Sequence, residues 1–216
     1  MPIINYASKE IQFKIVYYGP ALSGKTTTIA YIHSRLPAAF RGDLVSLATA
    51  ADRTLFFDFL PVDAVILQGF KTKFQLYTVP GQVVYNTTRQ LVLRSVDGVV
   101  FVADSHWDKI HEDVESFRNL EENLRKQHLS LDEIPYVLQY NKRDLPDAAP
   151  VSYLDFLLNN RRRRARSYEA IATKGRSVFA ALDAVTQSVL NKFIQENHLL
   201  RPAPARESAT AGRVGG

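Results

Sequence analysis

The alternation of apolar and polar positions along the chain predicts a series of short strands. Residues 99–103 are continuously apolar, which is typical of a strand covered on both faces. In Phe70–Val79, every second residue from Phe70 to Thr78 falls on one face, as in a half-exposed strand. The pattern predicts strands at Ile11–Tyr18, Thr54–Leu60, Phe70–Val79, Gly98–Asp104, Tyr136–Asn141 and Tyr168–Ala172.

Helical spacing separates most of these strands. Apolar residues recur every three or four positions over 110–124 and again over 178–193, and a shorter helix is expected at Thr26–Arg35. Strands that alternate with helices predict an α/β fold with a mostly parallel six-stranded sheet and helices on both faces. Because no helix pattern separates Thr54–Leu60 from Phe70–Val79, we expect that pair to be antiparallel.

Composition is that of a globular chain, with 46% hydrophobic and 23% charged residues among 216. We expect one domain over 1–198 and a disordered tail rich in Ala, Pro, Gly and Arg over 199–216. No apolar run reaches the roughly 18–20 residues that span a bilayer, and the N-terminus does not resemble a signal peptide. A cytoplasmic protein is therefore expected.

The chain has no cysteine, which excludes disulfides, thiolate metal sites, prenylation and palmitoylation. Pro2 excludes myristoylation, so no lipid anchor is expected. The net charge is +5, and five of the 27 basic residues lie in Arg161–Arg166. That run is either a solvated loop or a surface for an anionic partner. A nucleic-acid site is disfavoured because no aromatic residues interleave with the arginines.

The segment Gly19–Thr26 has the spacing G-x-x-x-x-G-K-T between a predicted strand and a predicted helix. In that setting the glycines let backbone N–H groups surround the β-phosphate of a nucleotide, next to a helix N-terminus. Lys25 is expected to reach the β- and γ-phosphates, and the Thr26 hydroxyl to bind Mg²⁺. The expected phosphate-binding residues are Gly19, Ala21, Leu22, Ser23, Gly24, Lys25, Thr26 and Thr27.

A second motif, Asn141-Lys142-Arg143-Asp144, stands at the end of a predicted buried strand, where ligands of α/β proteins bind. Asp144 can accept two hydrogen bonds from guanine, whereas adenine offers no such donor pair and would leave the carboxylate unpaired. Asn141 is expected to tie this loop to the phosphate loop, and the Lys142 stem to cover the base. The stretch Ala172-Thr173-Lys174 is either a further base contact through a backbone N–H or an ordinary loop.

Between these motifs, Gly81 and Gln82 follow another strand end. Gly81 N–H is placed to bind a γ-phosphate, and Gln82 to orient an attacking water. With these residues the sequence resembles the Ras-like small GTPases, and especially the bacterial MglA group, over about residues 3–198. The specific marks are Tyr17–Pro20, Leu55–Phe59, Tyr77–Gln82 and Asn141–Pro146.

The resemblance implies roles for a further pair, Arg53 and Thr54. Thr54 would coordinate Mg²⁺ beside Thr26, and Arg53 would act as an intrinsic arginine finger, worth roughly 10³–10⁵ in rate, unless it is only a solvated loop residue. Most Ras-like proteins have Asp at the position of Thr78, whereas MglA-like proteins share the Thr. Asp58 on the neighbouring strand is a candidate electrostatic substitute for the missing carboxylate.

The resemblance also implies a function. It indicates a switch that binds GTP or GDP with Mg²⁺, hydrolyses GTP slowly with Gln82, Arg53 and Lys25 as catalytic residues, and controls bacterial polarity or motility. Its expected partners are a Roadblock/LC7-type regulator resembling MglB and effectors that sense the GTP state. The chain is expected to be monomeric alone and to concentrate at a cell pole. A GTP-binding scaffold that does not hydrolyse GTP is the alternative.

Overall fold

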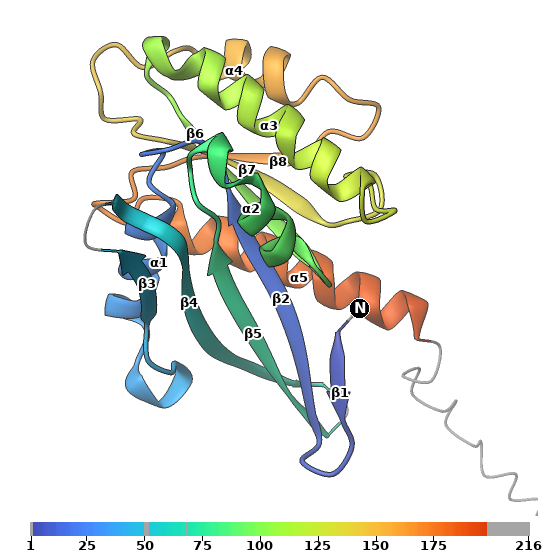
Figure 1. The fold of residues 1–216 in the computed structure, drawn as a ribbon. Helices are drawn as coiled ribbons and strands as arrows, with labels where there is room; N and C mark the ends of the chain where they lie inside the picture. Colours follow the sequence, from blue (N-terminus) through green and yellow to red (C-terminus); the bar gives the residue numbers. More distant parts are fainter. Residues whose placement is uncertain (1, 50–51, 68, 198–216) are drawn as a thin grey trace, which may run out of the picture.

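The computed structural model describes residues 2–49, 52–67 and 69–197, and the side chains of 47–49, 52–57, 65, 66 and 83 lie outside that description. One central sheet carries helices on both faces (Figure 1), as the pattern of alternating strands and helices predicts. The strands are β1 (Ile3–Asn5), β2 (Glu10–Tyr18), β3 (Val45–Thr49), β4 (Asp52–Leu67), β5 (Phe70–Thr78), β6 (Gly98–Asp104), β7 (Tyr136–Asn141) and β8 (Arg166–Glu169). The helices are α1 (Lys25–Arg35), α2 (Asn86–Leu93), α3 (Ile110–Arg125), α4 (Val151–Leu158) and α5 (Val178–Glu196), with short 3-10 turns η1 (Ala38–Phe40), η2 (Val83–Tyr85) and η3 (Trp107–Lys109).

The strand order is β3-β4-β5-β2-β6-β7-β8, and β1 pairs with β2. The pairs β2–β5, β2–β6, β6–β7 and β7–β8 are parallel, whereas β1–β2, β3–β4 and β4–β5 are antiparallel. The antiparallel pairing of β4 with β5 and the mostly parallel sheet are therefore confirmed.

The prediction of six strands was wrong, because the described residues form an eight-stranded sheet. β1 has only three residues and lies against Glu10–Gln12 of β2, ahead of the point at which β6 joins β2 at Ile15. So short a strand leaves too little alternation to be seen in a sequence. The sequence pattern also did not predict β3, which lies at the edge of the sheet beside β4. The pairing of β3 with β4 contains a register shift.

The last strand also differs from its prediction, since β8 covers Arg166–Glu169 and not Tyr168–Ala172. The strand ends at Glu169, and three residues later Ala172 N–H donates to the side-chain oxygen of Asn141 over 2.9 Å. The disordered tail expected over 199–216 falls outside the described residues, so that expectation stays a prediction.

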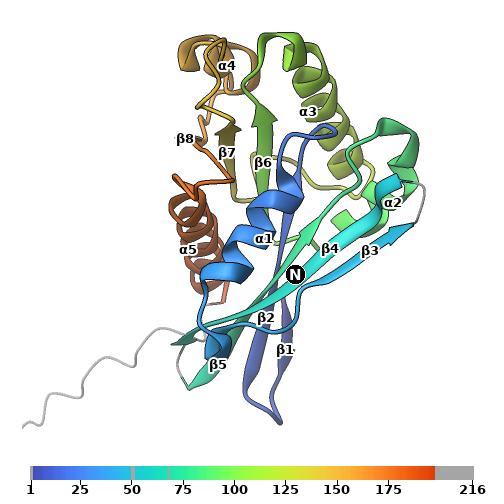
Figure 2. The same ribbon diagram turned by 90° about the vertical axis from the view of Figure 1, so that its left-hand side faces the viewer.

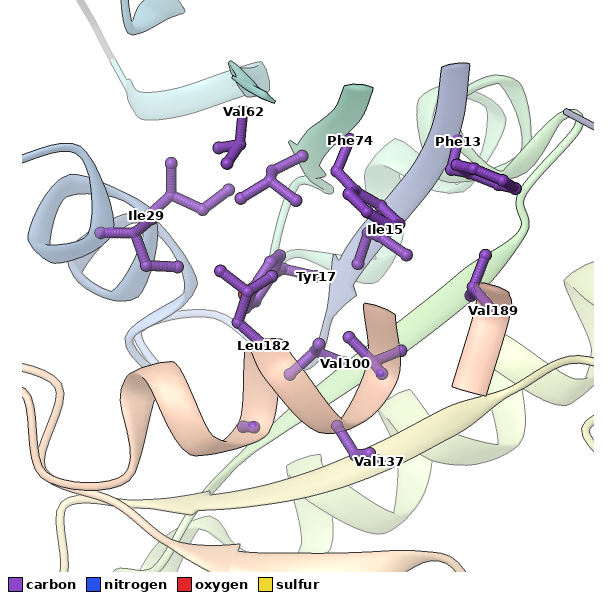
Figure 3. Close-up of a cluster of buried hydrophobic side chains, with 14 of the residues drawn as sticks. Phe13, Ile15, Tyr17, Ile29, Val62, Phe74, Val100, Val137, Leu182 and Val189 are labelled. Atoms are coloured by element: carbon purple, nitrogen blue, oxygen red, sulfur yellow. The ribbon is translucent and has the colours of Figure 1, made fainter. Parts of the chain in front are cut away.

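Two hydrophobic clusters hold the layers together. One lies under α1 and α5 (Figure 3), where Ile29 and Leu182 pack with Ile15, Tyr17 and other residues of the sheet. The second lies under α2, α3 and α4, and Figure 2 shows α3 and α4 on the face of the sheet away from α1 and α5. Every residue of β6 is buried, which confirms the prediction of a strand covered on both faces. No helix in the described ranges is both long and apolar enough to cross a membrane.

The parallel arrangement brings the carboxyl ends of β2, β5, β6, β7 and β8 to one edge of the sheet. In open α/β sheets, ligands bind at that edge. The segments that follow β2, β5, β7 and β8 contain the three predicted motifs and the loop 170–174. The topology therefore gathers the predicted site residues from distant parts of the chain.

Gly98, the first residue of β6, tests how tightly α5 packs on the sheet. A Cβ added there would lie 2.7 Å from Val189 Cγ2, 2.9 Å from Ile15 Cδ1 and 3.0 Å from Val185 Cγ2. We expect Gly98→Ala to lower the free energy of unfolding by about 1–3 kcal/mol through overpacking, measured by urea denaturation. Adding Val189→Ala makes room, so the double variant is expected to lose less than the sum of the single losses. Additive losses would show that the helix does not press on this strand.

Candidate nucleotide-binding site

The phosphate loop joins β2 to α1, and its two glycines are required by its geometry. Gly19 has φ +148° and Gly24 has φ +103°, in the region that side chains disfavour. A Cβ on Gly19 would lie 2.1 Å from Val102 O, and one on Gly24 would lie 2.1 Å from Asn141 Nδ2. Gly24 is also the N-cap of α1, and no side chain in the described part of the chain caps that end. The backbone N–H groups there can therefore receive an anion.

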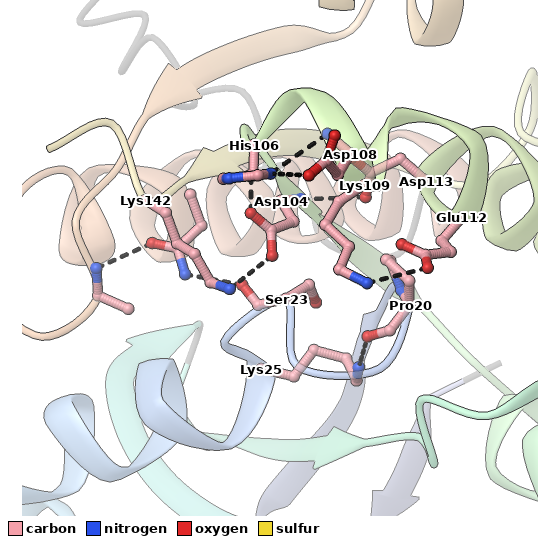
Figure 4. A network of polar contacts seen from close by, with 12 residues as sticks. Pro20, Ser23, Lys25, Asp104, His106, Asp108, Lys109, Glu112, Asp113 and Lys142 are labelled. Atoms are coloured by element: carbon pink, nitrogen blue, oxygen red, sulfur yellow. Dashed lines mark hydrogen bonds and ion pairs between the residues drawn. The ribbon is translucent and has the colours of Figure 1, made fainter. Parts of the chain in front are cut away.

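Lys25 lies within this loop with its side chain buried. Its ammonium group donates to Gly19 O over 3.0 Å and to Pro20 O over 2.5 Å, and Figure 4 shows the second contact. Burial, followed by the charge of Arg89, lowers the pKa of Lys25 to about 7, although Asp113 and Asp58 act in the opposite direction. An anion such as a phosphate that approaches this buried lysine would stabilise its charged form. Of the other loop residues, Ser23 is buried, while Ala21, Leu22, Thr26 and Thr27 are exposed.

The hydroxyl of Thr26 donates to Asp58 Oδ2 over 2.7 Å. Asp58 comes from β4 and is buried, and the same oxygen accepts a hydrogen bond from the Thr78 hydroxyl over 3.0 Å. Its other oxygen accepts from the Ser46 hydroxyl. The carboxylate that Thr78 does not supply is thus brought to Thr26 from the adjacent antiparallel strand.

Asn141, at the end of β7, joins the two halves of the site. Its Nδ2 donates to Ser23 O over 2.8 Å, and its Oδ1 accepts from Ala172 N–H over 2.9 Å. The side chain is buried. The expected link from this loop to the phosphate loop is therefore present in the structure.

The remaining base-reading residues surround the same point. The Asp144 carboxylate is exposed and lies 3.4 Å from the Lys174 ammonium group. Lys142 forms an ion pair with Asp104 at the end of β6, as Figure 4 shows. Ala172 N–H is used by Asn141, and Lys174 N–H donates to Ile171 O over 3.0 Å. Among the described N–H groups of Ala172, Thr173 and Lys174, these bonds leave that of Thr173 able to contact a base.

The segment after β5 brings Gly81 against the phosphate loop. A Cβ on Gly81 would lie 2.3 Å from Ala21 Cα, so the two backbones are in close contact. Gln82 follows as the N-cap of η2 and is exposed. Arg53 and Thr54 belong to β4, but their side chains lie outside the described ones, and their roles stay predictions.

A buried polar network that the sequence pattern did not predict lies next to this segment. Arg89 on α2 is fully buried, and its guanidinium contacts Asn119 of α3. Asn119 in turn accepts a hydrogen bond from the Tyr18 hydroxyl at the end of β2, over 2.6 Å. The signal was available, because Arg89, Val92 and Leu93 have the spacing of one helix face and the arginine occupies an apolar position of that face.

The described residues offer single oxygen atoms that could bind a metal ion, but no complete set of protein ligands. Among the described residues, no group of three or more His, Cys, Asp or Glu side chains is placed to hold an ion. Mg²⁺ commonly binds one or two protein oxygens together with substrate phosphates and water. The Thr26 hydroxyl with the Asp58 carboxylate beside it fits that kind of site.

Asp113 of α3 is a buried acid next to this site. Its Oδ1 accepts from Asp104 N–H over 3.0 Å, and its Oδ2 finds no donor among the described residues. Burial raises the pKa of Asp113 to about 8, and the neighbouring Asp104 and Glu112 carboxylates add to the rise. We infer that this group is neutral in the folded chain at pH 6.

This pKa predicts a pH dependence of stability. Because the folded chain holds a proton that the unfolded carboxyl loses near pH 4, stability falls by about 1.4 kcal/mol per pH unit until the folded pKa is reached. Between pH 6 and pH 8 the native chain should therefore lose about 2 kcal/mol more than Asp113→Asn. Urea denaturation at both pH values measures this, and equal pH dependence of the two chains would contradict a neutral Asp113.

Comparison with known proteins places the chain in a family. No protein-family model matches it. It is 52% identical over 193 residues to the mutual gliding-motility protein MglA of Myxococcus xanthus (strain DK1622), and the match covers 89% of this chain and 98% of the relative. This agrees with the motifs of the phosphate loop, the Thr78–Gln82 segment and the base loop. The chain therefore belongs to the MglA family of Ras-like small GTPases.

Proposed function

We propose that this chain is a switch that binds GTP or GDP with Mg²⁺, hydrolyses GTP slowly, and controls cell polarity or motility. The contact that supports nucleotide binding best is the double hydrogen bond of Asn141, which joins Ser23 of the phosphate loop to Ala172 of the loop after β8. This pair of bonds sets the distance between the loop expected to bind phosphates and the loop expected to bind the base. The family supports guanine nucleotide as the ligand.

Guanine selection is assigned to Asp144. Its exposed carboxylate can accept two hydrogen bonds from the ring N–H and amino group of guanine. Adenine would leave the carboxylate unpaired, at a cost of roughly 1–3 kcal/mol or more. Thr173 N–H would bind the guanine carbonyl oxygen, and the Lys142 stem would cover the base. The Lys142 ion pair with Asp104 holds that stem beside the loop.

The residues that would hold Mg²⁺ are Thr26 and, in the GTP state, Thr54. When bound, the ion would neutralise charge on the phosphate oxygens. Asp58 would support it from behind Thr26, as its hydrogen bond to the Thr26 hydroxyl suggests. This assigns to Asp58 the supporting role that an Asp in place of Thr78 has in other Ras-like proteins.

The proposed hydrolysis is direct attack by water. Gln82 orients the water, whose oxygen forms a bond to the γ-phosphorus while the bond from that phosphorus to the β–γ bridging oxygen breaks. GDP leaves, and the water's proton ends on the released phosphate or in solvent. Lys25 and Arg53 stabilise the negative charge that develops on the phosphate oxygens. No covalent intermediate is involved, so positioning sets the rate.

The biological role follows from the relative and not from the site. The relative is named as a mutual gliding-motility protein, and we propose that this chain acts in bacterial motility or polarity. Its partners would be a Roadblock/LC7-type regulator resembling MglB and effectors of the GTP state, and it would work in the cytoplasm, concentrated at a cell pole. The chain alone would be a monomer.

The central test is multiple-turnover GTP hydrolysis, with and without a Roadblock-type partner and with ATP as the competing substrate. We expect the native chain to turn over GTP slowly and the partner to accelerate it. Gln82→Ala should remove most of the stimulation, and Arg53→Ala should lower the stimulated rate by about 10³-fold or more, as loss of an arginine finger does. Released phosphate measures both.

Two exposed residues on distant helix positions provide matched controls, Gln187→Ala on α5 and Arg125→Ala at the end of α3. Both should keep the native rates. Stimulated turnover at the native rate in Gln82→Ala and Arg53→Ala would overturn the catalytic assignments but not the nucleotide site. Tight GTP binding with no turnover under any condition would instead establish the non-hydrolysing scaffold.

The role of Asp58 predicts a change in the magnesium requirement. Removing a residue that supports a metal ligand typically costs 10–100-fold in metal affinity. We therefore expect Asp58→Asn to need at least about tenfold more Mg²⁺ to slow GDP release. A magnesium titration of GDP dissociation measures this.

Asp63→Asn is the matched control, because Asp63 lies on the same strand but is exposed near Lys73. Its magnesium requirement should be native. A general loss of packing in Asp58→Asn would speed GDP release equally with and without Mg²⁺. That result, or a native magnesium requirement, would exclude Asp58 as the supporting carboxylate.

A further inference from the structure

Arg89 is the largest side chain that is fully buried in the described structure, at 0% exposure. It lies on α2, directly after the segment that contains Gly81 and Gln82. A buried charge is costly unless its hydrogen bonds are satisfied. The partners that Arg89 has in the interior therefore indicate why an arginine stands at this position.

Two of these partners are backbone carbonyls of the segment that faces the phosphate loop. Arg89 Nε donates to Pro80 O over 2.8 Å, and Nη2 donates to Gly81 O. The third nitrogen, Nη1, donates to Asn119 Oδ1 over 2.7 Å, and the guanidinium lies 5.1 Å from the centre of the Tyr18 ring. No ion pair of Arg89 appears among the described residues, so the partners that the structure records for its charge are carbonyl groups and a ring.

The bond to Pro80 O decides where the next N–H points. In a trans peptide the carbonyl oxygen and the N–H of the following residue point in opposite directions. Because Arg89 holds Pro80 O, the N–H of Gly81 is directed away from Arg89. On its other side, Gly81 packs against Ala21 of the phosphate loop, where an added Cβ would come within 2.3 Å of Ala21 Cα. The second bond, to Gly81 O, orients the peptide that leads into Gln82 in the same way.

Asn119, which accepts a hydrogen bond from Arg89, is itself held by further hydrogen bonds. Asn119 accepts from the Tyr18 hydroxyl over 2.6 Å and donates to Asn86 Oδ1 over 3.1 Å. Asn123 donates to Asn86 Oδ1 over 2.7 Å and to the Tyr18 hydroxyl over 3.1 Å. The guanidinium is thereby tied to β2, α2 and α3 together. A satisfied buried network of this kind specifies one arrangement of its members.

We infer that Arg89 is a positioning residue that holds the Pro80–Gly81–Gln82 backbone so that Gly81 N–H can receive the γ-phosphate, and that it thereby sets the preference of the site for GTP over GDP. This rests on the proposed function, since it concerns the same nucleotide site. GTP and GDP differ only by the γ-phosphate, so a residue that acts through Gly81 changes the affinity for GTP and leaves that for GDP. A residue needed only for folding changes both.

Arg89→Lys tests this, because it keeps the charge but cannot form the planar set of bonds to two carbonyls and an amide at once. Dissociation constants are measured for GDP and for a non-hydrolysable GTP analogue, together with thermal unfolding. We expect the ratio of analogue affinity to GDP affinity to fall about tenfold, the size of one lost hydrogen bond to a charged group, with GDP affinity within about twofold of native. GTP hydrolysis should slow in parallel.

Asn119→Ala is the second variant, in case the lysine destabilises the chain, because it removes one acceptor of Arg89 and leaves the guanidinium in place. The ratio should fall in the same direction by a smaller factor. The control is Arg125→Lys, an exposed arginine at the end of α3, and it should keep the native ratio.

The possible outcomes separate this inference from the proposed function. A native chain that binds neither nucleotide would overturn the proposed function. If the native chain prefers GTP, two results would overturn the role of Arg89 alone. In one, the variants keep the full preference for GTP. In the other, they lose affinity for both nucleotides equally as the melting temperature falls.

Discussion

The site depends on the contact between Gly24 and Asn141. Because Gly24 has no Cβ, the Asn141 amide can approach the phosphate loop, donate to Ser23 O and still accept from Ala172 N–H. Any larger residue at position 24 would fill the place of the Asn141 Nδ2, 2.1 Å from an added Cβ. Both hydrogen bonds come from one buried side chain at the end of β7, so the phosphate loop and the loop after β8 are held to the same residue.

A second constraint concerns charge at the start of α1. Thr78 stands where related switches carry an aspartate, and a hydroxyl there cannot supply a negative charge. The structure compensates across the β4–β5 pair, because Asp58 reaches the Thr26 hydroxyl and also accepts from Thr78. The three side chains lie at one point of the sheet edge, with Thr78 holding the orientation of the carboxylate that it does not itself provide. The carboxylate beside the Thr26 hydroxyl therefore comes from β4 and not from β5.

Sequence alone was enough to bring together those candidate site residues that follow strand ends. Gly19, Gly24 and Asn141 were predicted because their motifs name both the residue and its neighbours, and a parallel sheet brings such ends together. Asp58 could only be suggested, since its contact with Thr26 depends on the register of an antiparallel pair. The short strand β1 and the exact end of β8 were not predictable either. β1 pairs with nearby residues, Glu10–Gln12, but its three residues are too few to show alternation, whereas the chain just after β8 contacts the distant Asn141.

Arg89 shows why a switch can use a buried charge where a stable core would use a leucine. An apolar side chain on that face of α2 would tolerate many positions of the backbone above it, because dispersion has little direction. A guanidinium in the interior has its charge-assisted bonds only when Pro80 O, Gly81 O and Asn119 are in place together. Any other arrangement of the segment leaves a buried cation with missing acceptors, which is strongly unfavourable. The cost of burying the arginine therefore favours the one arrangement of the segment in which all three acceptors are present.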